Sequence, residues 1–403
     1  MKLELLAPAG SLNKLKVAFR YGADAVYVGG KKFSLRAYAG NFELDELAEG
    51  VKYAHERGKK LYVTVNIFPK NSDFEEAEKY FKYLEEIGVD AVLITDPGFF
   101  TLCKRVAPSL PIHISTQANN LNKYTVEFWK NQGAERVVLA RELRLEEVKE
   151  IHDHNPDVEL EAFVHGAMCI SYSGRCLLSN YLSTRDGNRG ECVQSCRWKY
   201  KISEASREGN PLEMEEDDRG TYILNSKDLN MLTHIDKLVD SGIISFKIEG
   251  RMKSEYYLAT VINAYRRAID EYVESGKIDN LETYLSELNK ITHRTYTEAY
   301  SFGKNDSTVS YSDDQDGGTH EFIAYVMGYA DGVAKIEMRN RFFKGDTLEI
   351  LSPKASFNER FVVNKVVNEK GDIVEDAKFV QEILYMDIPF EVQEGDILRR
   401  ARK

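Results

Sequence analysis

Four of the five cysteines in the sequence lie within residues 161–200, in the stretch EAFVHGAMCISYSGRCLLSNYLSTRDGNRGECVQSCRWKY. They are Cys169, Cys176, Cys192 and Cys196, spaced C-x6-C-x15-C-x3-C. Structural zinc sites usually use C-x2-C or C-x4-C pairs at both ends, and this spacing fits neither well. Iron–sulfur clusters are held by thiolates and tolerate irregular spacing. Spacing alone therefore leaves three interpretations open: a 4Fe–4S cluster, a zinc ion, or a role without metal.

The residues around these cysteines suit an anionic metal centre. Positive charge lowers the pKa of a thiol and offsets an anionic cluster, and glycine lets the backbone approach and donate N–H groups to sulfur. The flanking cations are Arg175, Arg189, Arg197 and Lys199, and the glycines are Gly174, Gly187 and Gly190. The fifth cysteine, Cys103, lies in an apolar helical pattern, and we expect it to be an inert core thiol.

Charge and hydropathy restrict the class of protein. No apolar run approaches the length of a membrane span, and residues 1–11 lack the apolar length and cleavage site of a signal peptide. We therefore expect a cytoplasmic protein with no membrane partner, in which clustered thiols stay reduced. The net charge of −11 argues against a general polyanion binder, although a local basic face remains compatible with nucleic acid.

A glycine followed by a buried-type apolar run recurs along the first two-thirds of the chain, as in GADAVYVGG (22–30), GVDAVLITD (88–96) and GAERVVLAR (133–141). Amphipathic helical patterns separate these runs. Eight strands are predicted, at residues 3–8, 25–29, 60–66, 91–95, 112–116, 136–140, 159–166 and 245–250. Eight alternating units predict an α/β fold, a (β/α)8 TIM-like barrel, with a doubly wound sheet as the alternative.

The predicted barrel, residues 1–275, carries a long insertion after its seventh strand. The insertion holds the cysteine loop (166–200) and a hairpin (199–228) around the acidic turn EMEEDDRG. Insertions at the C-terminal end of a barrel strand lie on the face where barrels place their chemistry. A helical connector (276–320) then leads to short alternating strands with Gly-Asp turns, which predict a small β-barrel domain at 321–403.

Polar residues follow the predicted strand ends and hairpin, where a barrel would bring them to one rim. We assign catalytic roles to His165, Glu249 and Asp228. Substrate-binding roles are assigned to Asn66, Gln117, Arg141, Glu142, Lys227, Lys247 and Arg251. Each residue alone is explained as simply by a salt bridge, but convergence from several strands favours a site. The excess of cations suits a small anion.

The segment EAFVHGAMCISYSGRCLLS closely resembles the signature of the peptidase U-32 family, the so-called collagenase-like proteases. LELLAPAGS, GADAVYVGG, STQAN, LAREL, NRGECVQSCRWKY, LNSKDL and KIEGRMKSEYY also resemble family segments, in the same order. The resemblance covers nearly the whole chain. The sequence nevertheless lacks HExxH, G-x-S-x-G and a local cysteine-nucleophile signature, so its residues do not support proteolysis.

The resemblance is strongest to the branch of the family that hydroxylates tRNA. It implies a 4Fe–4S cluster on the four cysteines, prephenate as co-substrate, and 5-hydroxylation of the wobble uridine. Prephenate is a dicarboxylate, which would give Arg141, Lys227, Lys247 and Arg251 a purpose. A peptidase and a structural-zinc binding protein remain the alternatives.

The expected partners are tRNA and, as in some relatives, a paralogous subunit. The reacting base would have to leave its stack to reach a barrel mouth. Tyr172, Trp198 and Tyr200 could stack this base or pack on the barrel. The basic tail RRARK suggests a grip on RNA.

Overall fold

The computed structural model describes residues 3–35, 40–198, 226–303 and 317–402, together with the backbone of 216–217, 220–221 and 315–316. Its first part is a closed barrel of eight parallel strands. The strands are β1 (Glu4–Pro8), β2 (Ala25–Gly29), β3 (Lys60–Val65), β4 (Ala91–Ile94), β5 (Ile112–Ile114), β6 (Arg136–Val138), β7 (Glu159–Ala167) and β11 (Ile243–Ile248). Each strand pairs with the next, and β11 pairs with both β7 and β1, which closes the ring. The predicted (β/α)8 barrel is confirmed.

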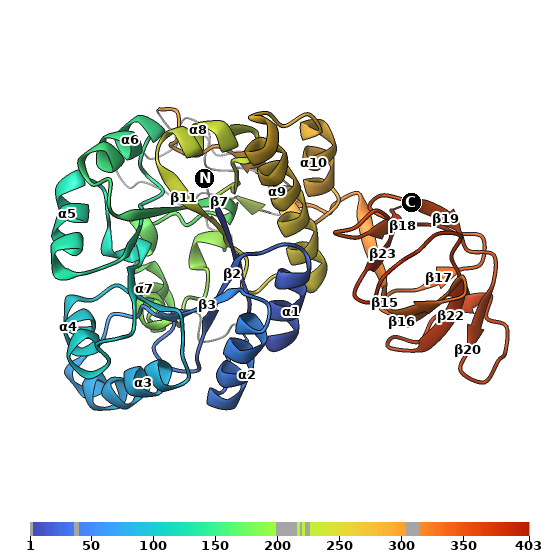
Figure 1. Cartoon of the computed structure of the whole chain (residues 1–403), viewed down its shortest axis with the longest axis horizontal. Coiled ribbons are helices and arrows are strands. Elements are labelled where there is room, and N and C mark those ends of the chain that lie inside the picture. The colour runs from blue at the N-terminus through green and yellow to red at the C-terminus, as the bar shows by residue number, and fades with distance from the viewer. Residues whose placement is uncertain are drawn as a thin grey trace.

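Helices surround the strands, as Figure 1 shows. They are α1 (Leu12–Arg20), α2 (Leu44–His55), α3 (Phe74–Glu86), α4 (Pro97–Val106), α5 (Lys123–Gln132), α6 (Leu145–His154), α8 (Ile235–Asp240) and α9 (Glu255–Ser275). Side chains stabilise several helix starts: Ser11, Asp96, Asn122 and Ser254 each accept a backbone N–H from the first turn. The predicted helical connector (276–320) contains one helix among its described residues, α10 (Leu281–Leu288).

The inside of the barrel contains an ionic layer. Arg136 is 2% exposed and bonds Glu4, Glu159 and Glu161, while Lys247 Nζ lies 2.7 Å from Glu161. Buried charges persist only when they are paired and hydrogen-bonded in this way.

The insertion between β7 and β11 is mostly irregular. Its short elements are η3 (Tyr172–Gly174), α7 (Leu178–Ser183), η4 (Gly187–Arg189), η5 (Ser195–Arg197), β8 (Glu216–Asp217), β9 (Gly220–Thr221), β10 (Asp228–Asn230) and η6 (Leu232–His234). Strand β10 runs antiparallel to the end of β7, with Asp228 opposite Ala167, and β13 (Tyr296–Thr297) extends this edge. Most of the predicted hairpin lies outside the described residues, although β8 and β9 pair antiparallel within it.

Gly166, near the end of β7, has a local reason to be glycine. Its φ is +103°, and a Cβ there would lie 2.3 Å from the backbone oxygen of Glu249. Glycine therefore lets β7 and the end of β11 approach closely at the mouth.

The C-terminal part is all β. Its strands are β15 (His320–Ala330), β16 (Val333–Met338), β17 (Phe342–Phe343), β18 (Thr347–Leu351), β19 (Arg360–Val362), β20 (Val366–Asn368), β21 (Asp376–Ala377), β22 (Ile383–Asp387) and β23 (Ile397–Ala401). Seven of them form one antiparallel sheet in the order β19-β18-β23-β15-β16-β22-β20, over its own apolar core. Among the described pairings, the end strands β19 and β20 are not joined to each other.

A buried ion-pair cluster joins the two parts of the molecule. Arg399 of β23 is fully buried and bonds Glu287 of α10 and Glu349 of β18, each at 2.7 Å. Lys290 bonds the same two carboxylates at 2.6 Å. The sheet domain therefore docks on α10 through paired charges, beside α9 and α10 in Figure 1.

Candidate functional site

The cysteine loop is held against the barrel by polar contacts to loops that follow barrel strands. Glu142, after β6, accepts hydrogen bonds from the backbone N–H and the hydroxyl of Ser173, at 2.6 and 2.7 Å. Arg175 donates through Nε to the backbone oxygen of Gln117, after β5, at 2.7 Å. Glu142 and Gln117, two residues predicted to bind substrate, therefore anchor the loop.

A second set of contacts fixes the middle of the loop. Asn188 and Cys176 bond each other twice, from the Cys176 N–H to Asn188 Oδ1 and from Asn188 Nδ2 to the Cys176 oxygen. Arg189 donates to the backbone oxygen of Phe68 and pairs with Asp73, at 2.8 and 2.9 Å. The loop is thus tied to the chain after β3 as well.

The four cysteines share one environment. Burial, together with the nearby thiols of Cys169, Cys192 and Cys176, raises the pKa of the Cys196 thiol. Cys176 Sγ accepts the N–H of Leu178 at 3.3 Å, and Cys192 Sγ accepts the N–H of Gln194 at 3.4 Å. Hydrogen bonds to sulfur of this kind stabilise thiolates. These four cysteines fit a thiolate-ligated group by donor type and by mutual proximity.

The thiols do not form a ready-made ligand cage. Within the described ranges, no three His, Cys, Asp or Glu side chains stand in an arrangement that could hold a metal ion. Cys169 Sγ instead lies 2.9 Å from the hydroxyl of Ser171. The prediction of a cluster on these four cysteines stays a prediction.

Cys103 differs from the other four cysteines. It lies in α4, is fully buried in the core, and burial raises the pKa of its thiol to about 12. A thiol that stays protonated at neutral pH is a poor nucleophile and a poor metal ligand. Its environment agrees with the predicted role of a core residue.

His165 lies under the mouth rather than on its surface. It is 1% exposed, with the rings of Tyr265 and Tyr296 each 5.5 Å away between centroids. Burial, with the positive fields of His293 and Lys253, lowers its pKa to about 3. Its Nε2 has no hydrogen-bond partner in the described part of the chain. The imidazole is therefore neutral at pH 7, and it lies out of reach of solvent.

Asp228 is paired with a cation that the sequence did not single out. It is 1% exposed, lies 3.3 Å from Arg294 Nη1, and accepts the Arg294 backbone N–H at 3.2 Å. Lys253 is nearby. Burial lowers the pKa of its ammonium group, and the positive charges of Arg294 and Arg197 lower it further, whereas the negative charge of Asp228 raises it. One cation, Arg294, thus pairs with Asp228, and two more, Lys253 and Arg197, lie near it beside the cysteine loop. Lys253 follows the KIEGR segment closely, which was an available signal, whereas nothing local marked Arg294.

Two of the predicted rim cations are already engaged. Lys247 points into the barrel interior toward Glu161, which leaves it 3% exposed. Arg251, also 3% exposed, crosses the mouth and donates to Ser34 Oγ at 2.9 Å and Thr64 Oγ1 at 3.2 Å. Both side chains fix the barrel, so as anion-binding groups they would first have to give up these contacts.

The remaining predicted residues lie around the same mouth. Arg141 donates to the backbone oxygen of Ala167 at 2.9 Å and stacks on Phe163, 3.8 Å from the ring centroid. Glu249 accepts the hydroxyl of Tyr27 at 3.2 Å, and Asn66 accepts the N–H of Leu35. Lys227 is half-buried beside Asp228. Lys199 and Tyr200, proposed from the sequence, lie outside the described residues.

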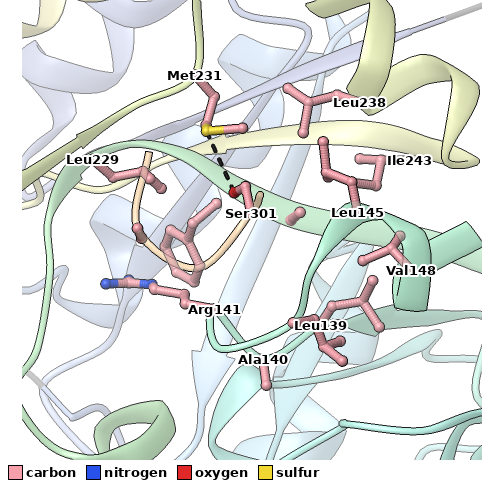
Figure 2. A pocket seen from close by; sticks show the side chains of 14 residues that line it. Leu139, Ala140, Arg141, Leu145, Val148, Leu229, Met231, Leu238, Ile243 and Ser301 are labelled. Carbon is pink, nitrogen blue, oxygen red and sulfur yellow. Dashed lines mark hydrogen bonds between the residues drawn. The ribbon is translucent and has the colours of Figure 1, made fainter. Parts of the chain in front are cut away.

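The cavity behind Arg141 is too small for a substrate (Figure 2). It measures about 30 Å³ and is lined mainly by apolar side chains, such as Leu139, Val148 and Ile243. That volume accommodates about one water molecule. A larger open pocket of about 480 Å³ lies beside β13 and is lined by residues such as Asn230, Tyr296 and Phe302.

Two family models match this chain. The family model for peptidase family U32 matches residues 10–310, and that for its C-terminal domain matches 318–399. The chain is similar to the solved structure of the U32 peptidase Mk0906, with 15% identity and a TM-score of 0.41 over 62% of this chain and 94% of that one. No described helix is both long and apolar enough to cross a membrane.

Several curated relatives match along nearly their whole length. tRNA hydroxylation protein P1 of Bacillus subtilis is 38% identical over 100% of this chain and 95% of its own. tRNA hydroxylation protein P of Escherichia coli is 37% identical over 97% and 95%. A protein of Methanocaldococcus jannaschii named as an uncharacterized protease, MJ0090, is 37% identical over 98% and 97%. With both family models matched and relatives of this identity, the chain belongs to peptidase family U32.

Proposed function

We propose that this protein is a tRNA hydroxylase whose reaction takes place at the barrel mouth beside the cysteine loop. The observation that carries the proposal is the end-to-end similarity, at 37–38% identity, to proteins named for tRNA hydroxylation. A base would have to leave its stack to reach the strand ends where the cysteine loop lies, since the cavity of about 30 Å³ behind Arg141 cannot hold it.

Cys169, Cys176, Cys192 and Cys196 would hold a 4Fe–4S cluster. When bound, such a cluster supplies one-electron chemistry at the mouth. The backbone N–H groups of Leu178 and Gln194 would then stabilise the thiolate ligands. Glu142 and Gln117 keep the loop in place over the strand ends.

A small dicarboxylate, prephenate by family resemblance, would be the co-substrate. Since Lys247 and Arg251 are held in buried contacts, the cations around Asp228 are better placed to meet it. Lys253 and Arg197 are half-buried, and Arg294 already shares Asp228. Guanidinium groups bind carboxylates through paired hydrogen bonds, which would orient the co-substrate beside Cys196. The wobble uridine as the exact target stays a prediction from the resemblance.

Proteolysis is the rival function, because the family carries that name. The hydrogen-bond partner of Cys169 is Ser171, and the pKa of His165, about 3, is too low for a general base at neutral pH. The described residues thus offer no observation that favours a peptidase.

The test is complementation in a bacterial host unable to hydroxylate uridine in tRNA. Expression of the wild-type chain should restore hydroxylated nucleosides in digested tRNA, measured by mass spectrometry. The Cys192→Ala variant serves as the negative control. If the iron-loaded wild-type protein restores none, alone or with a paralogous subunit, the proposed function is wrong.

A further inference from the structure

Helix α7 of the cysteine loop has its polarity reversed relative to an ordinary surface helix. One of its serines faces inward: Ser179 is 1% exposed, while Ser183 is half-buried. Large apolar side chains face solvent, with Tyr181 and Leu182 of the helix at 86% and 41% exposure and Leu177, which precedes it, at 73%. A surface helix normally places its apolar residues on the buried side. We call Leu177, Tyr181 and Leu182 the α7 face.

The inward serine explains why the helix is held in this orientation. The Ser179 hydroxyl donates to the backbone oxygen of Arg185 at 2.8 Å and accepts the N–H of Val193 at 3.1 Å. The Ser183 hydroxyl donates back to the Ser179 oxygen at 2.6 Å. These bonds join α7 to residues 185 and 193 of the cysteine loop through one buried hydroxyl. The α7 face is therefore presented to solvent by a built polar scaffold.

The surroundings of the α7 face are aromatic and cationic. Tyr172 and Trp198 of the same insertion are 54% and 42% exposed. Residues 169–198 hold four arginines, of which Arg189 pairs with Asp73, against two acidic residues, in a chain whose net charge is −11. Arg175 is an exposed member of this set. Exposed rings among arginines are the composition that binds single-stranded nucleic acid.

We propose that the α7 face stacks unpaired bases of the RNA substrate and so positions them beside the cysteines. This inference rests on the proposed function and adds the surface that recognises the substrate. Tyr181 is the principal stacking residue, because its ring is the most exposed on the face and every base offers a flat surface to it. The arginines of the insertion attract the phosphate backbone.

A second copy of this chain is the less suitable occupant. In a two-fold interface the same patch meets itself, so the excess of arginines on one insertion would face the same excess on the other. Such like-charge contact opposes association. RNA with unpaired bases suits the surface better, because its phosphates complement the arginines and its bases can cover the exposed apolar side chains of the α7 face.

The test uses the full-length, iron-loaded protein and unmodified tRNA, with affinity measured by fluorescence anisotropy. Tyr181→Ala should weaken binding by about 5- to 150-fold, the range for loss of one base–ring stack. Tyr181→Phe keeps the ring and should bind within about twofold of wild type, since the ring rather than the hydroxyl stacks. Tyr124→Ala is the matched control, because Tyr124 of α5 is 65% exposed and has a cation, Lys123, over its ring.

Further measurements separate the possible failures. Tyr181→Leu should bind as weakly as the alanine variant; binding equal to Tyr181→Phe would overturn stacking in favour of generic apolar contact. A fully paired RNA duplex should compete poorly, and equal competition would overturn the role of unpaired bases. Self-association of the wild type that Tyr181→Ala abolishes would assign the face to a second copy instead. If the wild type hydroxylates tRNA while Tyr181→Ala binds it normally, this inference fails and the proposed function stands.

Discussion

Cys176 and Cys192 each accept a backbone N–H from two residues further along the chain. If either sulfur is a thiolate, these N–H donors stabilise it without any rearrangement of the backbone, because they already point at the sulfur. Of the other two cysteines, Cys169 is exposed and Cys196 is partly buried. The four thiols therefore differ in exposure although they share one neighbourhood, which spacing in the sequence could not have indicated.

Replacement of Cys192 by alanine should remove a cluster ligand. We expect loss of bound iron and sulfide, loss of visible absorption, and loss of tRNA hydroxylation. Cys103→Ala is the control: its thiol is buried and raised in pKa, so it should keep both iron and activity at a stability cost of roughly 1 kcal/mol. Anaerobic iron and sulfide analysis measures the first effect. Equal behaviour of the two variants would contradict the ligand assignment.

His165 should make the protein sensitive to acid. Its pKa is about 3 in the folded state and near 6.5 when unfolded, so below pH 6.5 the unfolded state binds more protons. Stability is then lost by about 1.4 kcal/mol per pH unit as pH falls from 6.5 toward 3. His165→Gln should flatten the decline in unfolding free energy between pH 7 and 5, measured by urea denaturation. An unchanged slope would show that His165 is not buried as a neutral ring.

Glu142 and Gln117 were selected from the sequence as polar residues that follow strands, and the structure places them at the mouth. Their partners belong to the cysteine loop, Ser173 and Arg175. Residue type and strand order predicted where these side chains lie. They could not predict the partner, since that depends on how an irregular insertion folds back over the barrel.

The cysteine loop as an element depends on few anchors. Glu142→Ala removes two hydrogen bonds to Ser173, each worth about 1.5–3 kcal/mol for a charged acceptor before solvent screening. We expect faster proteolytic cleavage near residues 173–190 and faster iron release to a chelator, with little change in barrel stability. Glu146→Ala, on the exposed surface of α6, is the matched control. Loop cleavage at the wild-type rate would show that Glu142 is not an anchor.

The strands were the most predictable elements. All eight barrel strands lie where the apolar runs indicated, because a strand buried on both faces leaves a continuous signal. Short strands such as β10, β12 (His293–Arg294) and β13 were not predicted. Their pairing is set by contact with the end of β7 or with neighbouring segments, and no local pattern records it.

At the scale of the whole molecule, the buried cluster of Arg399, Lys290, Glu287 and Glu349 joins barrel and sheet. In the sequence, the basic tail RRARK suggests a grip on RNA. Arg399 instead is fully buried between two carboxylates, and Arg400 bonds Glu321 and Asp346. At least these two tail arginines serve the fold, and a contribution of the tail to RNA binding stays a prediction.

Arg399→Met should destabilise the protein by about 3–5 kcal/mol, because it leaves Glu287 and Glu349 buried with less positive charge. Arg341→Ala removes an exposed pair with Asp376 and should cost at most about 1 kcal/mol. Urea denaturation of the full chain measures both. Similar costs for the two variants would mean that the interdomain cluster contributes little.

The anchors of the cysteine loop also have a consequence for biosynthesis. Phe68, Asp73, Gln117 and Glu142 all precede the cysteines in the chain, whereas β11, which closes the ring, follows them. A ribosome therefore releases the docking surface first, then the loop, and only later the closing strand. The nascent loop meets a barrel whose first seven strands have been synthesised but whose ring is not yet closed by β11. If the four cysteines bind a metal, loading before ring closure would reach Cys176 and Cys196 while they are less covered than in the folded protein, where both are only partly exposed.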